Sequence, residues 1–439
     1  MGWNGAGGCC RSRDGCGGAI SLAIPFSSIA CGGRKLENSS SERNYGLAAI
    51  LAGALLLRIV LAASFKGHPI DVGTFSAWAG HAAEGLLSFY SPGYFADYPP
   101  GYIYVLWLIG KSRALLQTGF DTPEFLVMLK FPAIAADLAT IGVIHHLATE
   151  QGHGRAKALT LAALYAFNPA VIADSAVWGQ VDSVLTLFVL LGVLWLERRP
   201  AASGAAFAAA LLVKPQALIF APVPLLWLGN QLFRRHTAAE LSLFMPAAIL
   251  VFALGVLPFA AENGPAWVVE KYASTLASYP YASLNAANVF ALVGGNGADA
   301  AQTALFLSFE TWGTVFLFVI LGWAAWLAWR GLTASDCVYL AAFLPVSVYL
   351  WSIKMHERYL FPALAMLLAY HILSRDRRAL WLFLGFSAML FVSMAQVLHL
   401  SARETWYIPR FDPLLLAVSG INLLSWSLLA WIGWRAERQ

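Results

Sequence analysis

The chain has 439 residues, of which 59% are hydrophobic and only 12% are charged. Ordinary soluble domains carry about 25% charged residues, so this composition excludes an assembly of soluble domains. Many apolar runs have the length of about 17–25 residues that a helix needs to cross a bilayer, which is too long for the strands of a membrane barrel. The net charge of +4 does not indicate a nucleic-acid partner. The sequence therefore predicts an all-α polytopic membrane protein.

About twelve apolar segments are interpreted as transmembrane helices because of their length and hydropathy. They cover residues 45–65, 124–148, 159–175, 181–196, 201–214, 216–230, 240–259, 303–329, 336–352, 359–374, 379–398 and 412–434. The fifth is short, and we expect it to end in a broken helix at Lys214-Pro215. The first is expected to be a signal anchor, because residues 1–44 are too long for the leading region of a signal peptide.

Residues 1–44 are predicted to form a disordered cytoplasmic tail rich in glycine, serine and cysteine, followed by a single transmembrane domain over residues 45–439. Four of the five cysteines lie in this tail, and their spacing matches no common zinc site.

Residues 101–117 decide the topology, because they begin apolar and then include Lys111 and Arg113. If they form a juxtamembrane helix, short basic loops such as Arg198-Arg199 and Arg234-Arg235 all face the cytoplasm, as the positive-inside rule requires. If they crossed the membrane, these loops would face outward. We therefore expect both termini in the cytoplasm and a first extracytoplasmic loop over about 66–123 that carries juxtamembrane helices.

Under this topology the unusual polar motifs share the extracytoplasmic side. Asp71 follows the first span in His68-Pro69-Ile70-Asp71 and begins a segment with apolar and aromatic residues at helical spacing. One interpretation is a helix N-cap, which stabilises a helix start by about 1 kcal/mol. The other is a general base held at the membrane surface.

Two further motifs carry groups that can hold a sugar. Asp97 and Tyr98 precede two prolines, which form either a simple turn or a rigid shelf for a ligand. Trp178, Gln180 and Asp182 lie between the third and fourth spans, where Trp178 fits an interfacial belt and Asp182 could cap the next helix. A binding role for this motif is an equally good interpretation.

Cations on the same side could hold a phosphate. Lys214 interrupts an apolar run, and an intramembrane lysine indicates a functional site unless it extends to the interface. Lys354, His356, Glu357 and Arg358 form the densest charged cluster, in which Arg358 could bind a phosphate through two nitrogens and His356 or Glu357 could assist a proton transfer.

Lys130 and Asp137 lie seven residues apart on one helix face, and we expect them to form an ion pair inside the bundle.

The sequence contains no phosphate-binding loop, dinucleotide fingerprint or HExxH motif, so we expect no cofactor and no metal. A site on the outer side has no access to cytoplasmic nucleotide sugars, so an activated sugar must arrive in the membrane. A polyprenyl-phosphate sugar needs interfacial cations, aromatic and amide groups around the sugar, and a carboxylate base for the acceptor hydroxyl. These parts all lie on one side of the membrane.

These motifs resemble the integral-membrane GT-C fold glycosyltransferases, most closely the bacterial relatives of GPI mannosyltransferase II (Gpi18-like). The resemblance covers about residues 65–365. It rests on Asp71-x-x-x-Phe75-x-x-Trp78, Tyr98-Pro99-Pro100-Gly101, Asp137, Trp178-Gly179-Gln180-x-Asp182, Lys214-Pro215-Gln216, Ser283-Leu284-Asn285-Ala286-x-Asn288 and His356-Glu357-Arg358-Tyr359-x-x-Pro362.

The resemblance implies an inverting transferase that moves a hexose, with mannose favoured, from a polyprenyl- or dolichyl-phosphate sugar to a glycan, lipid or protein acceptor. It maps the catalytic aspartate to Asp71 and implies a multi-pass protein of the bacterial inner or plasma membrane. We expect Lys214, Arg358 and Lys354 to bind the donor phosphate. The sugar and acceptor contacts are expected from Asp97, Tyr98, Trp178, Gln180, Asp182, His356 and Glu357. The alternative is a transporter or flippase of a lipid-linked sugar, which would use similar residues.

Overall fold

The computed structural model describes residues 37–234, 236 and 238–435, and residues 43–439 form one compact unit. The expected disordered tail, with its four cysteines, lies outside the described residues up to position 36. Its last part, residues 37–44, is helical, because α1 begins at Glu37.

Nearly all elements are helices, and the only sheet in the described part is a two-stranded hairpin. In chain order they are α1 (Glu37–Ser64), α2 (Pro69–Glu84), α3 (Pro100–Leu116), α4 (Pro123–Glu150), α5 (Arg155–Ala166), α6 (Pro169–Ile172), the π-helix η1 (Ala173–Trp178), α7 (Asp182–Trp195), α8 (Pro200–Val213), the 3₁₀-helix η2 (Pro215–Phe220), α9 (Pro222–Arg234), α10 (Ala239–Asn263), α11 (Trp267–Ala277), α12 (Val289–Leu292), β1 (Thr303–Ala304), β2 (Leu307–Ser308), α13 (Phe309–Trp329), α14 (Ala334–Trp351), α15 (Phe361–Ser374), α16 (Arg377–Ser401) and α17 (Pro413–Arg435).

Within the described ranges, eight helices are long and apolar enough to cross a membrane, and a bent pair of helices adds a ninth. The prediction of an all-α polytopic membrane protein is therefore confirmed. Three of the twelve expected segments are shorter apolar helices, namely α7, α8 and α15. The segment 303–329 begins with the β1–β2 hairpin, so its helix starts only at Phe309.

The expected continuous span 159–175 is wrong in detail, because the chain bends by 43° between α5 and the α6–η1 helix. Asn168 causes the restart: its side chain accepts hydrogen bonds from the backbone N–H groups of Ala170 and Val171. Pro169 follows at the first helical position, where its missing N–H costs nothing.

The expected break at Lys214-Pro215 is confirmed. α8 ends at Val213, Lys214 is extended, and the chain continues as the 3₁₀-helix η2. Pro215 removes an N–H that a continuous helix would use, and non-helical backbone at this depth is tolerated only where protein or a cavity surrounds it.

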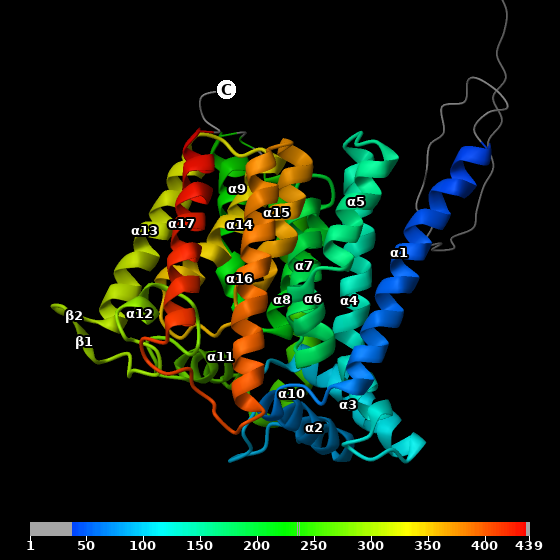
Figure 1. The fold of residues 1–439 in the computed structure, drawn as a ribbon, viewed down its shortest axis with the longest axis vertical. Coiled ribbons are helices and arrows are strands. Elements are labelled where there is room, and N and C mark those ends of the chain that lie inside the picture. Colours follow the sequence, from blue (N-terminus) through cyan, green and yellow to red (C-terminus); the bar gives the residue numbers. More distant parts are fainter. Residues whose placement is uncertain (1–36, 235, 237, 436–439) are drawn as a thin grey trace, which may run out of the picture. The chain divides into compact units, whose positions relative to one another are not determined.

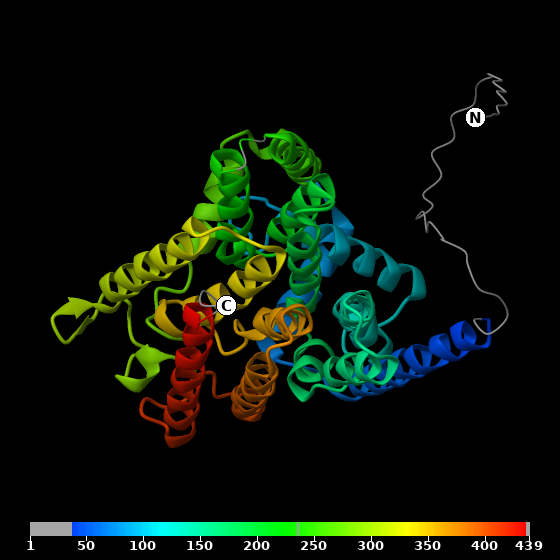
Figure 2. The same cartoon turned by 90° about the horizontal axis from the view of Figure 1, so that it is seen from above.

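Residues 101–117 form α3, which is not among the helices that qualify as spans. α3 packs against α2, and both lie across one end of the helix bundle, here called the site end (Figure 1; Figure 2 gives the view along the bundle). The apolar face expected for α2 is buried, including Val72, Phe75 and Trp78. The juxtamembrane helices α2 and α3 therefore cover the site end of the bundle, and α2 contains Asp71.

Gly110 allows α2 and α3 to approach closely, because a Cβ at this position would overlap the backbone of Ala79. Gly110→Ala is expected to destabilise the protein by about 1–3 kcal/mol through overpacking. Gly73→Ala on α2 is the matched control, since a Cβ there meets nothing within 4 Å and alanine favours the helix. Thermal unfolding of the detergent-solubilised variants checks this, and equal melting temperatures for the two would contradict the close-packing argument.

The expected Lys130–Asp137 ion pair is wrong. The fully buried Asp137 instead accepts a 2.9 Å hydrogen bond from Arg58 of α1, and the Ser175 and Ser183 hydroxyls also donate to it. Lys130 donates to the backbone carbonyls of α1 and η1, at the positions where those helices end. Spacing on one helix predicted a local pair, but α1 supplies a closer cation from 79 residues away.

Candidate active site

A cavity of about 550 Å³ opens at the site end. Residues from α2, the turn before α3, the η1–α7 junction, η2 and the loops 278–285, 352–359 and 406–407 line it. Of the predicted site residues, those that line this cavity are Asp71, Asp97, Tyr98, Trp178, Gln180, Lys214, Lys354, His356, Glu357 and Arg358. Asp182 lies behind the wall, next to a much smaller void.

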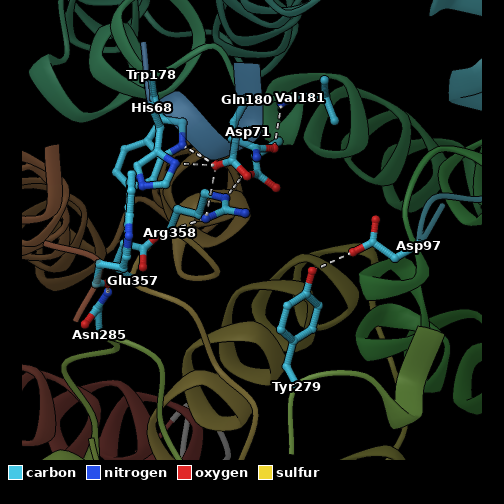
Figure 3. A network of polar contacts seen from close by, with 12 residues as sticks. His68, Asp71, Asp97, Trp178, Gln180, Val181, Tyr279, Asn285, Glu357 and Arg358 are labelled. Atoms are coloured by element: carbon cyan, nitrogen blue, oxygen red, sulfur yellow. Dashed lines mark hydrogen bonds and ion pairs between the residues drawn. The ribbon is translucent and has the colours of Figure 1, made fainter. Parts of the chain in front are cut away.

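Asp71 lies in the first turn of α2, but it does not cap that helix. His68 is the N-cap residue, without a side-chain cap, and Pro69 begins the helix. The Asp71 carboxylate accepts a 2.6 Å hydrogen bond from Trp178 Nε1 (Figure 3). The side chain is 20% exposed, so one part of the carboxylate remains accessible from the cavity.

Two basic groups flank the same carboxylate oxygen. His68 Nδ1 lies 3.6 Å and Arg358 Nη1 lies 3.7 Å from Asp71 Oδ2. Burial by itself would raise the pKa of the Asp71 carboxyl, but Arg358, His68 and the hydrogen bond from Trp178 hold it well below its usual range. Asp71 therefore remains an anion across the physiological pH range.

Arg358 is the central cation of this wall. It bonds Glu357 at 2.7 Å and lies 3.7 Å from both Asp71 and Asp182. Its Nε has no hydrogen-bond partner within the described part of the chain, although it is buried. The adjacent carboxylates raise the pKa of Arg358 despite its burial, and burial raises the pKa of Glu357.

Lys214, at the break between α8 and η2, is almost fully buried. Its Nζ donates to Asp182 Oδ1 at 2.7 Å and to Gln180 Oε1 at 3.3 Å. Gln180 Oε1 also accepts from the hydroxyl of Tyr98, over whose ring the lysine nitrogen sits at 5.6 Å. The helix break, the η1–α7 junction and the turn before α3 are thus joined in one polar network.

Asp97 lies on a separate wall of the cavity, away from the Asp71–Arg358 group (Figure 3). Its carboxylate accepts a 3.0 Å hydrogen bond from the Tyr279 hydroxyl. Burial raises the pKa of Asp97 above its ordinary value, and this bond only partly offsets the shift. The cavity therefore holds two carboxylates whose environments move their pKa values in opposite directions.

His356 and Lys354, the other basic residues of the 352–359 loop, lie in different environments. Burial and the nearby Arg358 lower the pKa of His356 to about 3, so its imidazole is neutral at physiological pH. Lys354 has a left-handed backbone (φ 63°), and its Nζ donates to the carbonyl of Leu276 in α11. Lys354 thus lies at the cavity edge with room for a further partner.

Sequence reasoning missed four residues of this region. His68 stacks on Trp178 with ring centroids 4.7 Å apart, and Tyr279 holds Asp97. Trp406 lines the cavity from a distant loop. Asp174 of η1 is fully buried, and neither of its carboxylate oxygens has a hydrogen-bond partner among the described residues. A carboxylate inside an expected span was a usable signal for Asp174, whereas the other three needed the tertiary structure.

Across the described ranges, no group of three or more histidine, cysteine, aspartate or glutamate side chains is arranged to hold a metal ion.

Residues 95–352 match the model of glycosyltransferase family 87, over more than half of the chain. The chain belongs to glycosyltransferase family 87. A search of curated proteins finds no match. Family 87 membership makes the protein an integral-membrane glycosyltransferase and gives no support to a transporter. The matched segment includes Asp97, Trp178 and Lys214, whereas Asp71 precedes it and Arg358 follows it. The Gpi18-like resemblance stays a prediction.

Proposed function

We propose that this family 87 glycosyltransferase moves a hexose from a polyprenyl- or dolichyl-phosphate sugar to an acceptor hydroxyl, with inversion of the anomeric configuration. The observation that carries the proposal is the pairing of Asp71, a carboxylate that is ionised at physiological pH, with a buried guanidinium, Arg358, on one wall of the cavity. The first can accept a proton and the second can stabilise a departing phosphate.

The shape of the cavity supports a donor that arrives from the membrane. One part of its lining is apolar and comes from η2 and α13, where Leu218 and Leu317 are 41% and 37% exposed. Both helices belong to segments apolar enough to span a membrane. A lipid tail can therefore lie along these helices while its phosphate reaches Arg358.

The charge distribution supports an extracytoplasmic site with both termini in the cytoplasm. The arginine-rich loops connect helices at the end of the bundle away from α2 and α3, where Arg375 follows α15 and Arg377 and Arg378 begin α16. By the positive-inside rule that end faces the cytoplasm. The cavity then opens on the side where nucleotide sugars are absent and lipid-linked donors are the available source.

The reaction is a single displacement. The acceptor oxygen forms a bond to the anomeric carbon while the bond from that carbon to the phosphate oxygen breaks. The acceptor proton passes to the Asp71 carboxylate and then to water, and the lipid phosphate leaves as an anion. Because the leaving group is already a stable anion, no strong general acid is required.

Three cations serve the phosphate in different ways. Arg358, whose guanidinium lies beside Asp71 on the cavity wall, makes the direct contact, and Lys354 approaches from the cavity edge. Lys214 is already held by Asp182 and Gln180, so it contributes positive potential at short range. Asp182 accordingly acts by positioning Lys214, while Gln180, Trp178, Tyr98, Asp97, His356 and Glu357 surround the two sugars.

The test uses the purified protein with radiolabelled polyprenyl-phosphate mannose, and in parallel polyprenyl-phosphate glucose, and a membrane fraction as acceptor. Mannose is the favoured donor because of the Gpi18-like resemblance. Label that moves with the wild type from either donor supports the proposal. No transfer from any lipid-phosphate sugar, but transfer from a nucleotide sugar, would overturn it.

The pH dependence follows from the opposite shifts of the two carboxylates. Asp71 stays ionised, whereas Asp97, with its raised pKa, gains a proton first as the pH falls. We expect kcat/KM to fall on the acid side as Asp97 loses its ability to accept hydrogen bonds from a substrate. Asp97→Asn is expected to give a low rate without this acid limb.

The measurement is the pH profile of transfer for the wild type, Asp97→Asn and the control Glu357→Gln, because burial also raises the pKa of Glu357. An acid limb that persists in Asp97→Asn and disappears in Glu357→Gln would assign the titration to Glu357 instead.

A further inference from the structure

A line of aromatic rings leads from the proposed base to the mouth of the cavity. Trp178 donates to Asp71, His68 stacks on Trp178, and Trp406 meets His68 edge to face at 6.1 Å. Tyr407 follows Trp406 in the chain and lies 6.2 Å from Tyr281. All five residues line the cavity.

Exposure rises along this line from Trp178 to Tyr407, and Tyr281 at its end is half-buried. Trp178 is 0%, His68 9%, Trp406 37% and Tyr407 47% exposed. The inner rings therefore form a wall next to the reacting atoms, and the outer rings present open faces at the cavity mouth. Large aromatic faces left open in a built cavity indicate a ligand that covers them.

The outer part of the line is held rigidly, although it lies in a loop between α16 and α17. Asn285 donates to the carbonyl of Trp406 at 2.9 Å and accepts from the N–H of Ile408 at 2.8 Å. Asn296 donates to the carbonyl of Ile408 and accepts from the N–H of Asn285. Two buried amides thus fix the backbone on both sides of Tyr407, so the rings are pre-organised.

We propose that Trp406, Tyr407 and Tyr281 form an acceptor subsite for a carbohydrate chain of at least two hexose units. This inference rests on the proposed function and names its acceptor class. The terminal hexose places its hydroxyl at Asp71, and the preceding units pack the C–H groups of their ring faces on the open aromatic faces. Such C–H groups carry partial positive charge, which the negative face of an aromatic ring attracts.

The positions of the walls favour this occupant over the donor lipid. The apolar lining that suits a lipid tail comes from η2 and α13, whereas the aromatic line comes from η1, the residue before α2 and the loops 278–285 and 406–407. The cavity lining also includes the hydroxyl groups of Tyr279 and Ser278, which can accept hydrogen bonds from sugar hydroxyls. A single hexose would cover only the inner end of the line.

The experiment measures binding without any donor, by saturation-transfer NMR with the full-length protein. The probes are mannotriose, maltotriose and galactotriose, each compared with its methyl monoglycoside, and a serine- and threonine-containing peptide. The variants are Trp406→Ala, Trp406→Phe and Tyr407→Ala. Trp381→Ala on α16 is the matched control, because Trp381 is an exposed tryptophan outside the cavity.

At least one triose is expected to bind more tightly than its monoglycoside. Trp406→Ala and Tyr407→Ala should each reduce that advantage by about 3- to 10-fold, whereas Trp406→Phe and Trp381→Ala should retain most of it. Trioses that bind no better than monoglycosides, unchanged affinity in both alanine variants, or binding of the peptide alone would each overturn the inference. Triose binding without transfer from any lipid-phosphate sugar would instead overturn the proposed function and leave the subsite standing.

Discussion

Replacing Asp71 with asparagine is expected to lower the rate of sugar transfer about 10²- to 10⁴-fold, the usual contribution of a general base. The fold should survive, because the asparagine side-chain oxygen can still accept the hydrogen bond that Trp178 donates at 2.6 Å. The loss should appear in kcat, since the carboxylate acts on the acceptor proton in the transition state. Initial rates with labelled donor, and thermal unfolding of the same preparations, give the two readouts.

Asp121→Asn is the matched control, because Asp121 is an exposed aspartate in the connection between α3 and α4 and lies outside the cavity. It should leave the rate unchanged. If Asp71→Asn turns over nearly normally while His356→Gln loses activity by the same large factor, the neutral imidazole of His356 is the base and the role proposed for Asp71 is wrong.

Arg358→Ala is expected to be the most damaging single change to the stability of the site. It removes the cation shared by Asp71, Asp182 and Glu357; Asp182 keeps Lys214, but the buried Glu357 loses its 2.7 Å ion pair and Asp71 loses the guanidinium beside it. Breaking such a group typically costs about 3–5 kcal/mol. We expect a large fall in the melting temperature of the solubilised protein together with loss of transfer.

The variant Arg358→Lys distinguishes the contribution of Arg358 to stability from its contribution to phosphate binding. Lysine restores the charge but not the planar fork that can bond a phosphate through two nitrogens. The melting temperature should recover for the most part, while transfer stays well below the wild type and the KM for the donor rises. Full recovery of transfer in Arg358→Lys would contradict a direct guanidinium contact with the phosphate.

Many residues of the candidate site could be predicted from the sequence, because a charged side chain in or beside a membrane span costs free energy. A lysine that interrupts an apolar run, a dense charged cluster beside a span and an aspartate just after the first span all need a compensating partner. Ten of the eleven predicted site residues line one cavity. Asp182 is the exception, because its place in the helix start turns its carboxylate toward Lys214.

The partners in the ion pairs were harder to predict from the sequence than the residues that line the cavity. The spacing of Lys130 and Asp137 on one helix predicted a local pair, yet Asp137 bonds Arg58 and Lys130 bonds backbone carbonyls. Residues seven positions apart on one helix face lie about 10 Å apart along the axis, so a cation from another helix in the bundle can approach the carboxylate more directly.

Local sequence features were sufficient to predict the class of the protein, most of the helical segments, the break at Lys214 and that residues 101–117 are not among the membrane-spanning helices. These features depend on local hydropathy, helix length and proline, which each segment carries on its own.

Only the tertiary structure decided that Asp71 faces Trp178 instead of capping α2, that Tyr279 holds Asp97, and that the loop around Trp406 closes the cavity. Each of these contacts joins residues more than 100 positions apart. These contacts form only when the helices and loops pack together, so no local sequence pattern predicts them.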